Sequence, residues 1–369
     1  MAIEKPLLFI ILIMLLHISA CTEHTETSLY TQNLPKNSTT IVAVGDIMLG
    51  GTAAEVLIKE GYNYPFKRVS PLLSNADIVI GNLEGPLTPI CNDSMELDKE
   101  YVFRSPAEKV APALKDAGFN LLSLANNHIL DYGVQGMNDT INALSEHSIN
   151  HVGAGNNSAL ARTGNLINTP NGKFGFLSYS LTFPESFWAT DNSPGTAFGH
   201  EKQITNDIKR LKKQADGVIV SFHWGREKTT ELRPYQPKLA RAAIDAGASV
   251  VLGHHPHILQ AIEQYKDGLI MYSLGNFVFG SYSKDAKTSV VARITLNEGK
   301  FYSAELIPIN VFNSEVIFQP KILSNAAATG VIEHINQLSA STNTRLGHLN
   351  DRGYLHASQN KIQSLVRNN

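Results

Sequence analysis

The sequence predicts an α/β fold with largely parallel central strands and a functional site at the C-terminal ends of those strands. Three observations predict it. Short apolar, β-branched runs end at glycine or a polar residue, amphipathic helical patterns separate these runs, and side chains of the metal-ligand type follow them. A repeated order of strand, helix and strand gives parallel strands joined by right-handed crossovers.

The predicted strands share a short apolar run bounded by a turn residue. They span residues 40–44, 76–80, 120–124, 217–222, 248–252 and 269–273. Helices are predicted between them at 107–117, 133–146 and 237–246. The first and the last of these helices are followed by Gly118 and Gly247, a common residue type just past a helix end. Alternating strands at 288–296 and 301–310 come next, and a helix is predicted at 327–338.

Composition limits the classes of function. The chain has 369 residues, of which 43% are hydrophobic, enough to bury the core of one large domain. Its formal net charge of -2 supplies no broad positive field, so we expect no nucleic-acid partner. Two cysteines are too few for a disulfide framework in a chain of this size.

The first twenty residues are predicted to be a targeting segment. A short start with Lys5 precedes an apolar run that is shorter than the roughly 20 residues of a spanning helix. The run ends in Ile18-Ser19-Ala20-Cys21, which resembles a bacterial lipobox in which the cysteine is acylated. An uncleaved anchor or an ordinary signal peptide is the alternative. We expect a protein lipid-anchored through Cys21 in the cell envelope, facing the periplasm or the exterior.

This gives four predicted segments. Residues 1–20 are a lipoprotein signal peptide, and residues 21–39 are a flexible polar tether. Residues 40–312 form the main domain, and residues 313–369 form a C-terminal extension with one helix and a polar tail.

Polar side chains gather at or just past the ends of the apolar runs. They are Asp46, Asn82, Glu84, Asn126, Asn127, His128, His223, His254, His255, His257 and Asn276. The carboxyl ends of parallel strands meet at one rim, where ligands bind. Carboxylates, imidazoles and amides together suit divalent metal ions, and a nearby histidine can protonate a leaving group. Singly, each of these residues also fits a turn or a helix cap.

The stretch from about residue 40 to 277 resembles a known family. Its segments read VGDIMLGG, GNLEGPLT, LANNHILDYG, a strand-end HWG, and GHHPHILQ followed by YSLGNF. In this order they resemble the CapA family, named for poly-γ-glutamate capsule synthesis, and behind it the calcineurin-like metallophosphatases. The resemblance implies a metallophosphatase-like layered α/β sandwich.

The resemblance also implies roles for individual residues. The implied metal ligands are Asp46, Asn82, Glu84, Asn127, His223, His255 and His257. His128 would be the general acid, with Asp131 supporting it. Glu227, His254 and Asn276 would lie on the substrate rim, with His254 facing away from the metal. The implied cofactor is one or two divalent ions of Mn, Zn, Mg or Fe.

Two positions depart from the ordinary phosphatase pattern. Met48 stands where those phosphatases usually place a histidine ligand. The second segment reads Gly81-Asn82 rather than Gly-Asp, which leaves Glu84 as its only carboxylate. Both one-metal and two-metal sites therefore stay open.

Three functions are compatible with these features. The first is a metal-dependent hydrolase-like protein in the synthesis or export of an anionic capsule exopolymer, with capsule synthesis or export proteins as partners. The second is an envelope metallophosphoesterase acting on a small phosphorylated compound. The third is a non-catalytic polymer-binding component of the assembly.

Overall fold

The computed structural model describes residues 34–90 and 101–357 of the chain. The described residues from Asn37 onward belong to one compact unit. The predicted signal peptide, Cys21 and most of the predicted tether lie outside the described residues. Within the described ranges, no helix is both long enough and apolar enough to cross a bilayer.

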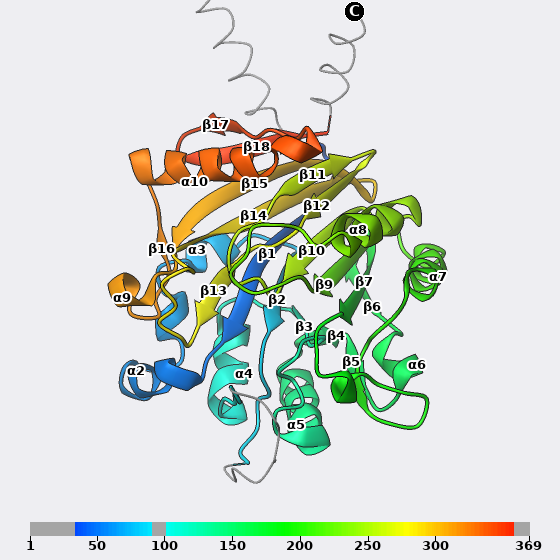
Figure 1. Cartoon of the computed structure of the whole chain (residues 1–369), viewed down its shortest axis with the longest axis vertical. Coiled ribbons are helices and arrows are strands. Elements are labelled where there is room, and N and C mark those ends of the chain that lie inside the picture. The colour runs from blue at the N-terminus through cyan, green and yellow to red at the C-terminus, as the bar shows by residue number, and fades with distance from the viewer. Residues whose placement is uncertain (1–33, 91–100, 358–369) are drawn as a thin grey trace, which may run out of the picture. The chain divides into compact units, whose positions relative to one another are not determined.

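The first of two main sheets is built around strand β1. Its path runs β17-β18-β15-β14-β1-β2-β3-β4, with β13 added beside β1 and β16 beside β15. The strands are β1 (Ser38–Met48), β2 (Ile78–Leu83), β3 (Leu121–Ser123), β4 (Asn150–Val152), β13 (Asn276–Phe279), β14 (Thr288–Asn297), β15 (Lys300–Asn310), β16 (Lys321–Ile322), β17 (Gly347–Leu349) and β18 (Arg352–His356). Strands β1 to β4 and β13 are parallel, and the remaining ones pair antiparallel (Figure 1).

The second sheet follows the order β11-β12-β10-β9-β7-β6. Its strands are β6 (Asn165–Thr169), β7 (Gly172–Ser180), β9 (Gly217–His223), β10 (Val250–His254), β11 (Ile262–Tyr265) and β12 (Gly268–Met271). The four inner strands are parallel, and only the edge strands β6 and β11 are antiparallel to their neighbours. A small separate ribbon pairs β5 (Ala154–Gly155) with β8 (Gly195–Thr196).

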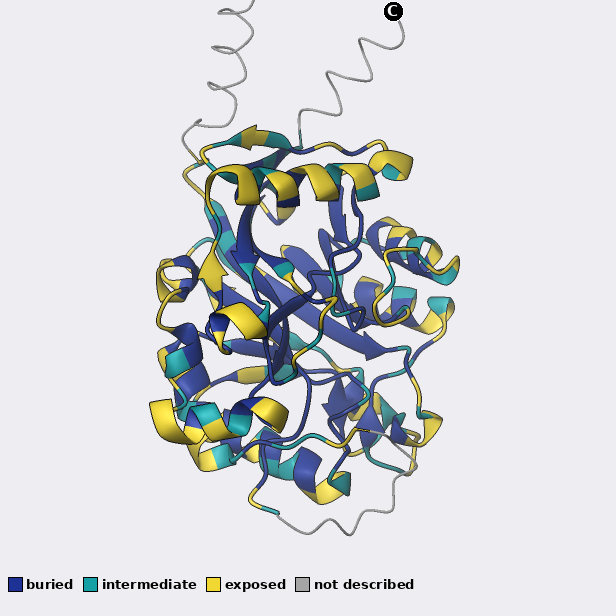
Figure 2. Cartoon of the chain, turned by 60° about the vertical axis from the view of Figure 1, so that its left-hand side comes forward, coloured by how far each residue is buried: buried dark blue, intermediate teal, exposed yellow. Residues whose placement is uncertain are grey.

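Most helices cover the outer faces of the two sheets, whereas the last one, at 325–338, packs into the apolar cluster between the sheets. The α-helices are α2 (Ala54–Glu60), α3 (Ser70–Leu73), α4 (Ala107–Asp116), α5 (Gly133–Glu146), α6 (Ser158–Ala161), α7 (Glu201–Lys212), α8 (Tyr235–Asp245), α9 (Asn313–Val316) and α10 (Asn325–Leu338). Single 3-10 turns occur at Gly51–Ala53, Tyr64–Phe66, Glu185–Phe187 and Ala340–Thr342. Figure 2 shows the buried strands between helices whose outward faces are exposed.

Three clusters of buried apolar side chains hold the layers of sheets and helices together. Alternate residues of β1 point to opposite sides, so Val42 packs with α4 and α5 while Ile41 packs between the two sheets. The cluster between the sheets joins Ile41 to Ile219 and Leu252 of the second sheet. A third cluster packs the other face of the second sheet against α7 and α8. The predicted layered α/β sandwich with largely parallel central strands is confirmed.

Several boundaries differ from those predicted by the sequence. Strand β1 extends through Asp46 to Met48, and β2 extends through Asn82, so both polar residues lie inside strands rather than just past them. The C-terminal extension holds more structure than one helix, because β17 and β18 join the first sheet. Strand β7 and helix α7 are further elements that the apolar pattern did not indicate.

Two glycines allow backbones to meet closely beside the polar strand ends. A Cβ atom on Gly45 would lie 1.9 Å from the carbonyl oxygen of Gly275, and one on Gly253 would lie 1.9 Å from that of Tyr272. Real Cβ atoms do not approach oxygen so closely, so any side chain at either position would push two strands apart.

We predict that Gly45→Ala lowers the free energy of unfolding by about 1–3 kcal/mol, because the clash is with backbone that cannot rotate away. Chemical denaturation of the wild type and the variant measures this difference in the free energy of unfolding. Gly330→Ala in α10 is the matched control, since nothing lies within 4 Å of the added Cβ. There alanine should raise the free energy of unfolding by about 0.5–1 kcal/mol. Equal effects at the two positions would contradict the packing argument.

Candidate metal centre

The polar side chains meet where the carboxyl ends of the parallel strands of both sheets come together. In the first sheet, Asp46 pairs in register with Asn82 of β2 on one side and with Asn276 of β13 on the other. The pairing shifts between Asp46 and Ile47, and such irregularities re-aim a side chain next to a site. In the second sheet, His223 and His254 are register partners at the ends of β9 and β10.

The segment after β10 turns sharply at its histidines. His255 has φ 93° and His257 has φ 60°, the left-handed region that residues other than glycine seldom adopt. Such conformations cost about 1–3 kcal/mol each and persist where the surrounding structure requires them. The strained residues are thus His255 and His257 themselves, whose imidazoles belong to the cluster.

Asp46 is fully buried and contacts residues from both sheets. Its Oδ1 accepts a hydrogen bond from Asn82 Nδ2 at 2.9 Å and lies 3.2 Å from His254 Nδ1. Its Oδ2 accepts from the backbone N–H of His255 at 3.2 Å and lies 3.3 Å from His257 Nδ1. Burial alone would raise the pKa of Asp46, but the adjacent His254 and His257 outweigh it and hold that pKa well below its usual range.

Glu84, also buried, lies directly after β2 at the centre of the cluster. Its Oε1 is 3.7 Å from His223 Nε2 and 3.7 Å from His257 Nε2. Three groups have ligand atoms that all lie within 4.8 Å of one another: Glu84, His223 and His255; Asp46, Glu84 and His257; and Glu227, His255 and His257. Because the first two groups share Glu84, the arrangement accommodates one ion or two bridged ions.

The imidazoles differ in their protonation. Burial lowers the pKa of His223 well below its usual range, and burial with the charge of His257 lowers the pKa of His255 to about 3. Burial also opposes the charge on His257, but Glu84 and Asp46 outweigh it and raise the pKa of His257 to about 10. His223 and His255 are thus neutral, and the neutral imidazole is the form that binds metal. The carboxylates of Asp46 and Glu84 favour a positive charge at the centre of the cluster.

The residues fit a divalent metal ion. His255 Nδ1 is buried without a hydrogen-bond partner among the described residues, which is unusual for a buried polar atom. The donor set combines two carboxylates with three imidazoles, a mixture that suits Zn, Mn or Fe. A bound ion would polarise an oxygen of the substrate and lower the pKa of a bound water. Asp46, Glu84, His223, His255 and His257 would hold it.

Asn82, a predicted metal ligand, lies among the carboxylates of the cluster. Its Nδ2 donates to Asp46 Oδ1 and to Glu84 Oε2 at 3.3 Å, while its Oδ1 accepts from Asn126 Nδ2 at 3.1 Å. The same Nδ2 lies 3.3 Å from His223 Nδ1. In this arrangement Asn82 links the two carboxylates to each other, and its role as a metal ligand stays a prediction.

Asn126 is a site residue to which the sequence analysis gave no role. Its Nδ2 also donates to the carbonyl oxygen of Leu83 at 2.8 Å, and its Oδ1 accepts from the N–H groups of His128 and Ile129. It thereby fixes the turn after β3 against the end of β2. The neighbouring Asn127, predicted as an amide ligand, has its Oδ1 2.8 Å from His223 Nε2 and so lies beside the cluster.

His128 and Asp131 form a hydrogen-bonded pair, as their proposed acid and supporting roles require. His128 Nδ1 lies 2.7 Å from Asp131 Oδ2, which also accepts from the backbone N–H of Phe103 at 2.8 Å. The ring of Phe103 packs on His128 with centroids 4.3 Å apart. Because Nδ1 is held by Asp131, proton transfer to or from a substrate would use Nε2. Phe103 lies outside every motif of the site, and no pattern in the sequence indicates its role.

The three predicted rim residues are not alike in the structure. Glu227 is exposed and lies within ligand distance of His255 and His257, consistent with a rim position. His254 is buried against Asp46, and Asn276 is buried with its Oδ1 2.9 Å from His257 Nδ1. The two strands carry His254 and Asn276 inward, to Asp46 and to His257, and a role of either residue in substrate contact stays a prediction.

Met48, the departure from the phosphatase pattern, is buried. Its Sδ accepts a hydrogen bond from the backbone N–H of Gly50 at 3.2 Å. This thioether is engaged with its own loop, so the position contributes no imidazole or carboxylate to the cluster.

We predict that the purified wild-type chain carries Mn, Zn or Fe and that the double variant His255→Ala/His257→Ala loses most of it. The reason is that the variant removes imidazoles from all three ligand groups. Elemental analysis by mass spectrometry of protein prepared without chelator measures the metal. The control His334→Ala/His348→Ala changes two exposed histidines and should keep the wild-type content. Equal metal in both double variants would remove the ligand assignment.

The chain is similar in sequence to bacterial proteins of capsule synthesis. The model of the family described as bacterial capsule synthesis protein PGA_cap matches residues 40–281. The capsule biosynthesis protein CapA of Bacillus anthracis is 35% identical over 314 residues, covering 84% of this chain and 75% of that protein. The PGA biosynthesis protein CapA of Bacillus subtilis (strain 168) is 36% identical over 269 residues, covering 73% of this chain and 70% of that protein.

Solved structures are similar at lower identity. A novel phosphatase from Mycoplasma pneumoniae has a TM-score of 0.47 and 17% identity, covering 75% of this chain and 95% of that one. The calcineurin-like phosphoesterase YfkN from Bacillus subtilis has a TM-score of 0.43 and 13% identity, covering 82% of this chain and 98% of that one. From the family match and the two CapA relatives, we conclude that this chain belongs to the bacterial capsule synthesis protein family PGA_cap.

Proposed function

We propose that this chain is a metal-dependent hydrolase-like protein of the cell envelope that serves the synthesis or export of a poly-γ-glutamate capsule. The observation that carries the chemistry is the buried cluster in which Glu84 lies between His223 and His257, with the His128–Asp131 pair nearby in the same network. The polymer is suggested by relatives that are named for capsule and PGA biosynthesis.

Each group has a definite task in this proposal. Asp46, Glu84, His223, His255 and His257 would hold the ion, and Asn82 keeps the two carboxylates oriented. His128, held through Nδ1 by Asp131, donates a proton from Nε2 to the leaving nitrogen or oxygen as water adds to the carbonyl or phosphoryl group. A water molecule is consumed and one amide or ester bond is broken.

The proposal includes a membrane anchor at Cys21 and partners among the capsule synthesis and export proteins. Two or more acyl chains would hold the protein at a membrane surface, since each buried CH₂ contributes about 0.8 kcal/mol. The anchor would keep the protein where a polymer emerges from the cell.

A second candidate is a phosphoesterase acting on a small phosphorylated compound. It is favoured by the two ligand groups that share Glu84, because a pair of bridged ions clamps both oxygens of an in-line phosphoryl displacement. Against it, Met48 supplies no imidazole where ordinary phosphatases have a ligand.

The role in capsule formation is tested in the organism of origin. Deletion of the gene should lower cell-associated poly-γ-glutamate, the wild-type gene should restore it, and His255→Ala/His257→Ala should not. Full restoration by that variant would show that the metal cluster has no part in the role, and an unchanged capsule after deletion would refute the role itself.

We predict that His128→Ala lowers hydrolytic turnover by about 10²–10⁴-fold while leaving the metal content unchanged, because it removes a proton donor and no metal ligand. Turnover is measured with Mn²⁺ on oligo-γ-glutamate and, separately, on bis(p-nitrophenyl) phosphate. His147→Ala, at the C-cap of helix α5, is the control and should keep full turnover.

The two substrates separate the candidates. Cleavage of the γ-glutamyl amide supports the first proposal, and cleavage of the phosphodiester alone supports the second. A chain that binds metal yet cleaves neither would be the non-catalytic assembly component, and the hydrolase proposal would then be wrong.

A further inference from the structure

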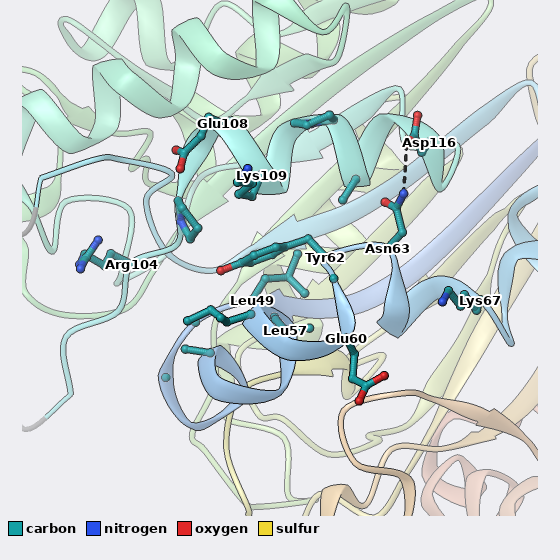
Figure 3. Close-up of a pocket in the computed structure, with 18 of the residues that line it drawn as sticks. Leu49, Leu57, Glu60, Tyr62, Asn63, Lys67, Arg104, Glu108, Lys109 and Asp116 are labelled. Carbon is teal, nitrogen blue, oxygen red and sulfur yellow. Dashed lines mark hydrogen bonds between the residues drawn. The ribbon is translucent and has the colours of Figure 1, made fainter.

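A groove separate from the metal cluster lies between α2 and α4. Its volume is about 1070 Å³. Figure 3 shows Tyr62 lying across it, with α4 on one side and the segment of α2 on the other. Nothing in the capsule proposal above uses this groove.

One end of the groove carries opposite charges beside a phenol. Arg104 precedes α4, Glu108 lies in its first turn, and the hydroxyl of Tyr62 points toward this end (Figure 3). Burial and the charge of Glu108 raise the pKa of the Tyr62 phenol, and Arg104 opposes them, so both charged groups lie within electrostatic reach of the phenol. A ligand seated here would meet a carboxylate, a guanidinium and a hydroxyl.

The rest of the wall nearby is apolar. Leu49 and Leu57 are buried beneath it, while Ile58 is 75% exposed and Val102 is 42% exposed. Exposed aliphatic side chains in a groove can cover the methylene groups of a ligand, and their burial by a ligand is favourable.

The groove and the metal centre share a chain segment. Val102 and Arg104 line the groove, whereas Phe103 between them packs on His128 and hydrogen-bonds Asp131. On the other side, Leu49 and Gly50 line the groove three and four residues after Asp46. A ligand bound in the groove would therefore contact two segments of the metal centre. One segment carries the proposed metal ligand Asp46, and the other packs against the proposed acid His128.

We propose that this groove binds the amino-terminal residue of a γ-linked glutamyl chain, with the ammonium at Glu108, the α-carboxylate at Arg104 and the methylenes against the aliphatic wall. This proposal rests on the proposed role in poly-γ-glutamate synthesis, and it names the part of the polymer that is recognised.

The balance of charges selects the chain end over the chain interior. The lining holds three cationic residues, Lys67, Arg104 and Lys109, and three acidic ones, Glu60, Glu108 and Asp116. An interior γ-linked residue has a carboxylate but no ammonium, so it would meet the acidic groups with repulsion. The first residue has both charges on one carbon, which matches a carboxylate and a guanidinium at one end of the groove.

The test is isothermal titration of the full chain with tri-γ-glutamate and with its N-acetylated form. Glu108→Gln, Arg104→Gln and N-acetylation should each weaken binding about tenfold, the usual effect of removing one charged hydrogen bond. The controls Glu55→Gln and Lys59→Gln make the same charge changes on exposed positions of α2 outside the groove and should stay within about twofold of wild type. Thermal unfolding of each variant checks that it is folded.

The metal-site variant separates this proposal from the proposed function. His255→Ala/His257→Ala should bind tri-γ-glutamate as the wild type does, because it leaves the groove intact. Loss of binding in that variant, or equal binding of the N-acetylated trimer, would overturn the groove proposal. Binding that follows the predicted pattern in a chain that neither hydrolyses the polymer nor affects the capsule would keep the groove and refute the function.

Discussion

The buried carboxylate of Asp46 is the constraint on which the site depends. A buried negative charge needs compensating partners, because water does not solvate it. Asn82 from the same sheet contacts this carboxylate, and so do His254, His255 and His257 from the second sheet and the segment after it. The two sheets can satisfy it only when their strand ends are in register and close together. The same requirement explains why glycines stand at positions 45 and 253, where backbones of adjacent strands meet.

Two amide side chains connect the buried carboxylates to the segment that presents His128. Asn82 links Asp46 to Glu84, Asn126 links Asn82 to the turn after β3, and that turn presents His128. Buried polar networks of this kind are stable only when each member has a partner. The position of the proposed acid is thus tied to the position of the carboxylates through the side chains of Asn82 and Asn126.

The sequence predicted the parallel strands β1, β2, β3, β9, β10 and β12, because each contains a short, largely apolar run. It did not indicate β7, whose segment GKFGFLSYS mixes glycine and serine with apolar residues although the strand is largely buried. Site residues were predictable as a set, but their orientation was not. Whether Asn82 turns its oxygen or its nitrogen to the carboxylates, and whether His254 points inward, depends on strand register, and the Phe103 contact with His128 depends on tertiary packing.

The direction of β1 places the start of the folded part and the metal-binding cluster at opposite ends of one strand. The chain enters this strand at Ser38 and reaches Asp46 eight residues later, about 26 Å away at 3.3 Å per residue. A tag or a solid support coupled ahead of Ser38 would therefore join the folded part about that far from the carboxylate.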